Sequence, residues 1–385
     1  MNSYNTINKK QPREDCYFNP NVGSNTMFVI QREKFQVESY TVTSEDGYIT
    51  TLYRIPNNTG KPVFIQHGAV SSSEFFVTQG NNSLAFQLHN RGYDVWLGNN
   101  RGSFNSPEHQ YLPRNSEEYW NYTLDDLGNY ELPAVIDFIV KKTGKKEKII
   151  YVGHSQGTTI GMIYDLLHPK HAKNNLEGFI FLGPVAFTSN LGIPFIKAFF
   201  ALAKLVAAVG VKHLGSRNEF LTKFCTTNEF KLKACKELID VGFGKSNQYP
   251  PDQLPTLISY SLMGESIKPI LQYVQMGNSN NFEAFDYETR GNLIMYNSTK
   301  PRQYHLNNIN LPVHLFGGLN DNLAPVQNVI KLSKHLGLCC KQLHFSGNIE
   351  DKIWFNHVNF LYGKDNTKLY NDIFKAMESL KNENC

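Results

Sequence analysis

The hydrophobic positions of the chain fall into short apolar runs that alternate with longer stretches of helical spacing. The short apolar runs lie at 62–68, 93–102, 149–153 and 179–184. Runs that are nearly all apolar are typical of strands buried on both faces of a parallel sheet. One intervening stretch, 123–141, begins at Thr123 as the expected N-cap and repeats apolar residues at helical spacing. The alternation predicts the α/β class, with helices on both faces of a mostly parallel sheet.

Other parts of the chain extend this sheet. Residues 37–55 alternate in polarity around an Asp-Gly pair, which predicts an antiparallel hairpin at the sheet edge. Short strands are predicted at 313–318 and 342–345, and an amphipathic helix at 368–380. The regular rhythm is lost between about 185 and 308, so we interpret that segment as an insertion over one end of the sheet.

The insertion contains an unusually apolar run at 193–215. Its apolar part approaches the length needed to cross a bilayer. Lys197 and Lys204 interrupt the run seven residues apart, which is two helical turns and therefore one face. Because charges inside a span are costly, we favour an amphipathic helix that packs on the core or meets a lipid surface.

Composition and charge exclude several classes of protein. The 385 residues are 41% hydrophobic and 19% charged, which suits a folded globular chain, and a net charge of +4 with mixed signs does not favour nucleic-acid binding. The six cysteines form no CxxC pattern for a metal. Cys225 and Cys235 are the one pair with spacing for a short disulfide loop, and spacing alone leaves a bridge and two thiols equally open. Residues 1–15 hold no apolar stretch of signal-peptide length.

The strand at 149–153 runs directly into the sequence Gly153-His154-Ser155-Gln156-Gly157. A Gly-x-Ser-x-Gly pattern between a buried strand and a helix is typical of a nucleophile elbow. The flanking glycines permit a tight turn, and the serine is then held at the N-terminus of the next helix. Backbone N–H groups and the helix dipole favour a developing negative charge there. We therefore predict that Ser155 is a nucleophile.

A serine needs a base, and in this arrangement an acid and then a histidine follow it in the chain. Asp321 comes just after the predicted strand 313–318, and His357 comes after the last strand. We expect Ser155 to attack an ester carbonyl, His357 to carry the proton and Asp321 to orient His357. The competing acids and histidines are Asp125, Asp126, Asp137, Asp286, His305, His314, His335 and His344.

An acyl-transfer site also needs donors for the oxyanion. We expect the backbone N–H groups of Gln156, directly after the nucleophile, and of Ala69, in the loop after the strand 62–68. His67 beside this loop is interpreted as structural. His89 and Asp94 match an HxxxxD acyltransferase pattern, which we interpret as coincidence because it spans a helix end and a strand start.

Several motifs together resemble the acid lipase family, which includes gastric and lysosomal lipases and steryl ester hydrolases. The similar segments are SEDGYITTLYRIP (44–56), IQHGAVSSS (65–73), RGYDVWLGNNRGSFNS (91–106), YVGHSQGTT (151–159), FEAFDY (282–287), GGLNDNLA (317–324) and HVNFLYGKD (357–365). The resemblance runs from about residue 37 to near the C-terminus. It implies the same triad and the same two oxyanion donors as the residues themselves.

The resemblance also implies an α/β-hydrolase fold with two core parts, 31–184 and 309–385, and a helical cap at 185–308. It further implies that Cys225 and Cys235 are candidates for the cap disulfide seen in some members. Many members are secreted or lysosomal, whereas the visible N-terminus carries no signal peptide, so the compartment stays open.

The combined expectation is a carboxylic ester hydrolase that cleaves neutral lipid esters, either triacylglycerol or steryl ester. An apolar insertion suits an acyl chain, and we expect the cap to contact a lipid–water interface. No cofactor, metal or nucleic acid is expected. Two alternatives remain: an acyltransferase that uses the same triad, and a catalytically inactive lipid-binding protein.

Overall fold

The computed structural model describes residues 19–144, 147–189, 204–215, 219–337 and 341–383. Within these residues, nine strands form one sheet in the order β1-β2-β4-β3-β6-β7-β10-β11, with β5 paired to β2. The strands are β1 (Glu38–Thr43), β2 (Tyr48–Ile55), β3 (Pro62–Gln66), β4 (Asp94–Leu97), β5 (Glu108–His109), β6 (Ile149–His154), β7 (Leu176–Leu182), β10 (Val313–Gly318) and β11 (Lys341–Ser346). The pairs from β4 through β3, β6, β7 and β10 to β11 are parallel, whereas β1 and β2 form the predicted antiparallel edge.

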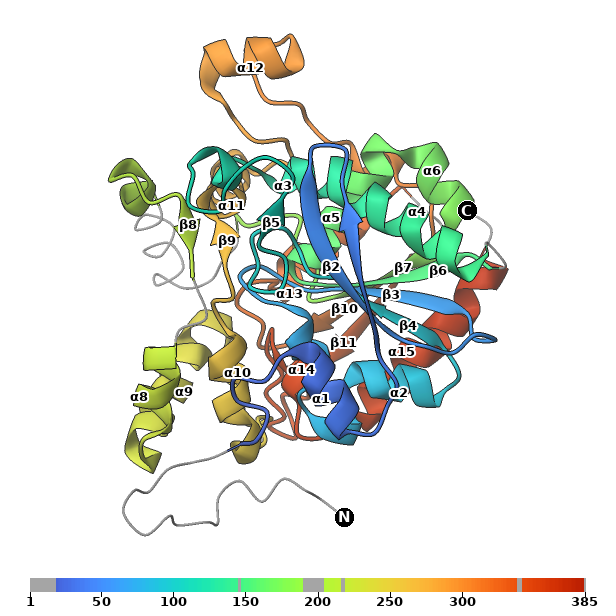
Figure 1. The fold of residues 1–385 in the computed structure, drawn as a ribbon, viewed down its shortest axis with the longest axis vertical. Coiled ribbons are helices and arrows are strands. Elements are labelled where there is room, and N and C mark those ends of the chain that lie inside the picture. The colour runs from blue at the N-terminus through green and yellow to red at the C-terminus, as the bar shows by residue number, and fades with distance from the viewer. Residues whose placement is uncertain (1–18, 145–146, 190–203, 216–218, 338–340, 384–385) are drawn as a thin grey trace.

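Helices cover both faces of the sheet (Figure 1). They are α1 (Thr26–Arg32), α2 (Leu84–Asn90), α3 (Leu124–Asp126), α4 (Leu132–Thr143), α5 (Gln156–Leu167), α6 (Pro169–Asn175), α8 (Glu219–Thr226), α9 (Glu229–Phe243), α10 (Leu254–Tyr260), α11 (Ile267–Ser279), α12 (Glu288–Tyr296), α13 (Val326–His335), α14 (Asn359–Tyr362) and α15 (Thr367–Ser379). Short 3-10 turns lie at Ser73–Phe76, Gly80–Asn82, Glu118–Trp120, Pro251–Gln253, Leu306–Asn308 and Leu380–Asn382.

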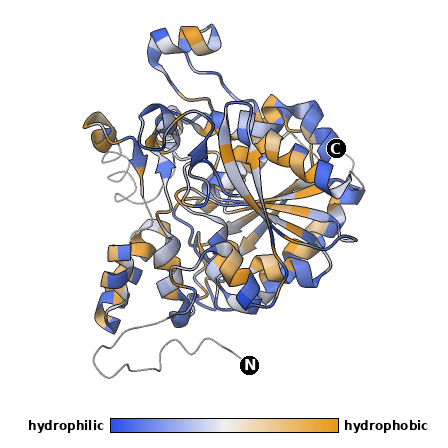
Figure 2. Cartoon of the chain, viewed as in Figure 1, coloured by the Kyte–Doolittle hydropathy of each residue, from blue (hydrophilic) through white to orange (hydrophobic). Residues whose placement is uncertain are grey.

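The strands alternate between two hydrophobic clusters, one on each face. In β3, for example, Val63 and Ile65 join the cluster that includes α1, α2 and α15, whereas Phe64 joins the cluster that includes α4, α5 and α13. Figure 2 shows hydrophobic residues both on the strands and on the helices that cover them. The predicted α/β-hydrolase fold with a mostly parallel sheet is confirmed.

The predicted helix at 123–141 differs from the observed one. Thr123 caps its start, in a capping box with Asp126. A π-helical turn, Leu127–Glu131, then separates α3 from α4. Pro133, in the first turn of α4, explains this π-helical turn. Proline has no N–H to donate to the preceding turn, and its ring clashes with the carbonyl four residues earlier.

Between β7 and β10, the described part of residues 185–308, which we call the inserted segment, carries α8 to α12 and a two-stranded pair, β8 (His213–Leu214) with β9 (Glu265–Ser266). Figure 1 shows α8 to α11 along one side of the sheet and α12 projecting away from the body. A disulfide between Cys225 and Cys235 joins α8 to α9.

The apolar run at 193–215 lies partly outside the described residues. Of its described part, residues 204–208 are helical and precede β8. No helix among the described residues has both the length and the apolar character to span a bilayer.

Candidate active site

Ser155 occupies a sharp turn between β6 and α5. Its φ of 55° and ψ of −119° are unusual for a residue with a side chain. The turn is possible because the residues two positions before and after Ser155 are glycines: a Cβ on Gly153 would lie 2.8 Å from the backbone of Gly157, and one on Gly157 would lie 2.4 Å from the carbonyl oxygen of Gln66. The Ser155 N–H donates to the carbonyl of Leu182 at 2.9 Å, which ties the turn to β7.

The structure brings Asp321 and His357 together with Ser155. The Oγ of Ser155 lies 2.7 Å from Nε2 of His357, although the two residues are 202 positions apart. On the other side of the ring, Nδ1 of His357 lies 2.8 Å from Oδ2 of Asp321. All three residues are buried. A hydroxyl, an imidazole and a carboxylate thus form one continuous hydrogen-bonded chain.

Neighbouring groups fix the acid and the histidine. The second carboxylate oxygen of Asp321, Oδ1, accepts hydrogen bonds from the N–H groups of Leu323 at 2.8 Å and Ala324 at 2.7 Å. This leaves Oδ2 directed at the imidazole. The ring of Phe243, from the end of α9, lies parallel to the His357 ring at 6.1 Å between centroids. The inserted segment therefore contributes one wall beside His357.

The two expected oxyanion donors lie on segments that border Ser155. Gln156 is the first residue of α5, so its N–H has no acceptor within the helix. Ala69 lies in the loop after β3, and this loop packs tightly on Ser155: a Cβ on Gly68 would lie 2.8 Å from the Cβ of Ser155. The Gln156 N–H lies at the positive end of α5, and Ala69 lies in a partly buried loop that borders Ser155.

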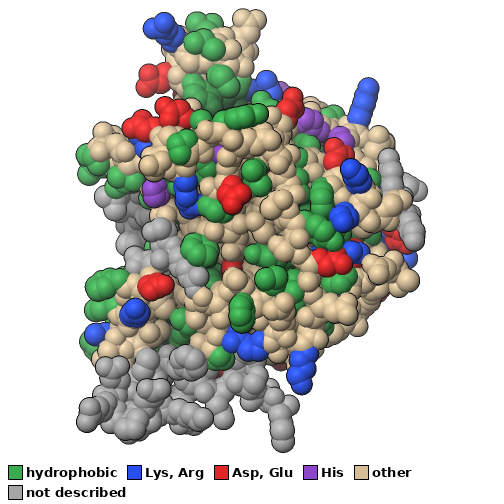
Figure 3. All heavy atoms as spheres, in the orientation of Figure 1, with side chains coloured by type: hydrophobic (Ala, Val, Ile, Leu, Met, Phe, Trp, Pro, Cys, Tyr) green, Lys and Arg blue, Asp and Glu red, His purple; other side chains and the backbone are tan. Residues whose placement is uncertain are grey.

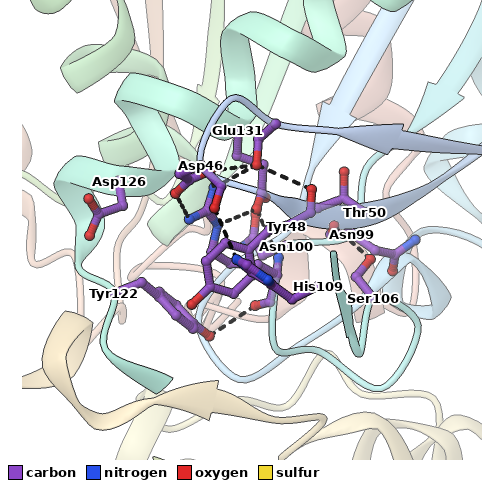
Figure 4. Close-up of polar contacts among 12 residues, drawn as sticks. Asp46, Tyr48, Thr50, Asn99, Asn100, Ser106, His109, Tyr122, Asp126 and Glu131 are labelled. Atoms are coloured by element: carbon purple, nitrogen blue, oxygen red, sulfur yellow. Dashed lines mark hydrogen bonds and ion pairs between the residues drawn. The ribbon is translucent and has the colours of Figure 1, made fainter. Parts of the chain in front are cut away.

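His67 belongs to the scaffold beneath this loop. Its Nε2 accepts a hydrogen bond from the N–H of Asn100 at 3.0 Å, and burial lowers its pKa to about 4, so the ring is neutral. The next residue, Arg101, is fully buried and donates to Glu131 at 2.9 Å and to Asp46 at 3.0 Å. Figure 4 shows Asp46 and Glu131 directed toward this shared centre. The turn after β4 is thereby fixed, and it supports the loop that carries Ala69.

Several of the competing acids and histidines have other contacts. Asp125 accepts from Tyr304, Asp286 from Asn292, and His314 contacts His344 at 3.1 Å. Asp94 of the HxxxxD pattern accepts from Arg54 and Trp96, both at 2.8 Å. Among the described residues, no cluster of His, Cys, Asp and Glu has the arrangement of a metal site.

Sequence reasoning missed two residues of this site, Phe243 and Glu265. Glu265 of β9 is 3% exposed and accepts a hydrogen bond from the Gln156 side chain. Both residues come from the inserted segment, in which no strand rhythm or motif marks them. A single glutamate between short apolar runs gives no sequence signal that its side chain will be buried beside Gln156.

The class of α/β-hydrolases is defined by a serine at a strand–helix elbow of a mostly parallel sheet. This serine is joined to a histidine and an acid from loops after later strands. Residues 61–351 match a family model described as the alpha/beta hydrolase fold, and residues 26–80 match one described as a partial alpha/beta-hydrolase lipase region. A soluble variant of monoglyceride lipase from Saccharomyces cerevisiae has a similar fold, with a TM-score of 0.55 and 17% identity over 90% of this chain and 94% of that one.

Curated relatives are more similar in sequence. Gastric triacylglycerol lipase of Rattus norvegicus is 34% identical over 93% of both chains. Lipase member K of Homo sapiens is 34% identical over 94% of this chain and 92% of its own length. The chain belongs to the acid lipase family of these enzymes. It is a serine ester hydrolase, with lipase or esterase activity.

Proposed function

We propose that the protein hydrolyses neutral lipid esters through an acyl-enzyme formed on Ser155. The observation that carries the proposal is the hydrogen-bonded chain from Ser155 through His357 to Asp321, with distances of 2.7 Å and 2.8 Å. His357 Nε2 accepts the Ser155 proton as Oγ attacks the ester carbonyl, and then donates that proton to the departing alcohol. Water attacks the acyl-enzyme by the same route and releases the fatty acid.

The negative charge of each tetrahedral intermediate is placed on the former carbonyl oxygen. We assign its stabilisation to the backbone N–H groups of Ala69 and Gln156. Asp321 holds the Nδ1–H tautomer of His357 and stabilises the imidazolium that forms during attack.

We further propose that residues 185–308 form a cap over this site and meet the lipid surface. Large apolar side chains are exposed on α8 and α9, with Phe220 at 77%, Phe230 at 81% and Leu238 at 65%. Figure 3 shows hydrophobic side chains on the outer surface of the insertion. Exposed aromatic and aliphatic groups of this kind favour a lipid–water interface. A triacylglycerol or a steryl ester presents such an interface together with a neutral ester bond.

A hydrolysis panel tests the proposal. Triacylglycerol, steryl ester and short p-nitrophenyl esters are offered to the wild-type protein and to Ser155→Ala, at acidic and at neutral pH. We expect the wild type to cleave a long-chain neutral ester and the variant to cleave none, with an unchanged circular dichroism spectrum. Turnover by Ser155→Ala equal to that of the wild type would contradict the proposal. A competing alcohol in the same assay distinguishes hydrolysis from acyl transfer by the product formed.

A further inference from the structure

Glu265 connects the two segments that we assign to the oxyanion hole. Its Oε2 accepts a hydrogen bond from the N–H of Val70 at 2.8 Å, and its Oε1 accepts one from the side-chain Nε2 of Gln156. Val70 follows Ala69 directly, and Gln156 follows Ser155. One buried carboxylate from the inserted segment therefore holds both donor-bearing segments at once, across 195 and 109 positions of sequence.

The conformation at Val70 requires such support. Val70 has a φ of 46°, in the left-handed region, which is strained for a β-branched residue. Its N–H is bound by Glu265, and its carbonyl accepts from the N–H groups of Leu262 at 2.9 Å and Met263 at 2.8 Å. The backbone that sets the direction of the Ala69 N–H is thus fixed from one short stretch of the insertion.

That short stretch is itself anchored to the core. The N–H of Ser266 donates to the hydroxyl of Tyr122 at 3.0 Å, and its Oγ donates to the carbonyl of Trp120 at 2.6 Å. The carbonyl of Met263 accepts from the N–H of Phe104 at 2.7 Å. The backbone around Glu265 is therefore held in place, so its carboxyl group can fix the positions of Val70 and Gln156.

We propose that Glu265 is a positioning residue for ester hydrolysis, which acts through Val70 and Gln156 to hold the Ala69 and Gln156 amides in line for the oxyanion. This inference rests on the proposed function. Because the amides must be aligned before charge develops, loss of the support lowers the rate of the chemical step more than substrate binding. Burial raises the pKa of Glu265 to about 7, because the enclosed site disfavours the charged form of the side chain.

The Gln156 side chain offers a way to separate the hydrogen bonds from the charge. Its Oε1 is buried and has no hydrogen-bond partner among the described residues. In Glu265→Gln the new amide accepts from Val70 with its oxygen. Once the Gln156 amide has rotated so that its Oε1 faces position 265, the nitrogen of the new amide donates a hydrogen bond to Gln156 Oε1. This variant keeps both connections, whereas Glu265→Leu removes both.

Kinetics on a soluble short-chain ester test the inference. We expect Glu265→Leu to lower kcat by about 30- to 100-fold, with KM changed less than about 3-fold, and Glu265→Gln to stay within about 5-fold of the wild-type kcat. Glu283→Leu is the matched control: Glu283 is also a buried glutamate of the insertion that accepts from a glutamine, Gln275 at 2.9 Å, and we expect it to keep the wild-type kcat.

A second variant covers the case in which Glu265→Leu does not fold. Gln156→Leu removes one of the two connections while keeping the backbone donor, and we expect about a 10-fold loss in kcat. Any one of three results would overturn the inference. The first is a kcat of Glu265→Leu equal to that of Glu283→Leu, and the second is a kcat of Glu265→Gln as low as that of Glu265→Leu. The third is a wild-type kcat in Gln156→Leu. Failure of the proposed function looks different, because the wild type itself would then show no Ser155-dependent turnover.

Discussion

The Nε2 atom of His154 lies 2.9 Å from the carbonyl oxygen of His357, so a residue inside the nucleophile elbow holds the backbone of the proposed base. Burial lowers the pKa of His154 to about 3, which keeps the ring neutral. A neutral ring that donates from Nε2 fixes the position of the His357 loop relative to Ser155. The elbow therefore sets the location of the histidine as well as that of the serine.

Replacing His154 tests this relationship. His154→Phe keeps a ring of similar size but loses the donor to the His357 carbonyl. A buried hydrogen bond contributes about 0.5–1.5 kcal/mol, so we expect kcat to fall about 3- to 10-fold while KM is retained. His335→Phe is the control, because His335 also donates to a carbonyl, that of Lys331, on an exposed helix surface. Equal kcat values in the two variants would argue against a role for the His154 contact.

Asp321→Asn tests the orientation of the base. The asparagine Oδ1 can still accept from Leu323 and Ala324, so the fold is expected to survive. Its NH₂ group then faces Nδ1 of His357 and favours the wrong tautomer. We expect kcat to fall by about 10³- to 10⁴-fold, as in serine hydrolases with the same change. Asp286→Asn, in the insertion, serves as the control, and a loss of less than 10-fold in Asp321→Asn would exclude Asp321 as the orienting acid.

The sequence predicts the core of this fold well and its insertion poorly. Strands such as β6 are buried on both faces and therefore appear as apolar runs, and the order of serine, acid and histidine follows from the sheet topology. Phe243 and Glu265 are different, because contacts with residues more than 100 positions away decide their roles. The π-helical turn before Pro133 was also missed, since apolar spacing alone does not report a local change in helical pitch.

The pH dependence of stability can be tested at Asp165 on α5. Burial raises its pKa from the ordinary value of 3.8 to about 7. Between pH 4 and 7 the folded chain keeps a proton that the unfolded chain has released, so this residue lowers the free energy of unfolding as pH rises. One pKa unit corresponds to about 1.4 kcal/mol, so ionised Asp165 lowers the free energy of unfolding by an amount on the order of a few kcal/mol.

Asp165→Asn removes this cost and keeps an acceptor for the Asn310 N–H. We therefore expect the Tm of the variant to equal that of the wild type near pH 4 and to exceed it increasingly up to pH 8, as measured by thermal unfolding. A Tm difference that is constant with pH would show that Asp165 ionises normally in the folded chain.

The Cys225–Cys235 disulfide closes a loop of ten positions between α8 and α9. In the chain-entropy model a loop of this length stabilises the folded state by about 3 kcal/mol. We expect the Cys225→Ser/Cys235→Ser variant to have a lower Tm and faster proteolysis in 219–243. Hydrolysis of a soluble short ester should be retained, because the hydrogen bonds that form the chain from Ser155 through His357 to Asp321 involve neither cysteine. Identical protease sensitivity with and without the bridge would contradict this role.

The central claim is that Ser155 is the nucleophile, activated by His357. The most direct measurement is labelling with a fluorophosphonate, followed by mass spectrometry of the modified peptide. We predict one label per chain, located on Ser155, with rapid labelling in the wild type and strongly slowed labelling in His357→Ala. A label on any other residue, or undiminished labelling of Ser155→Ala, would contradict the account.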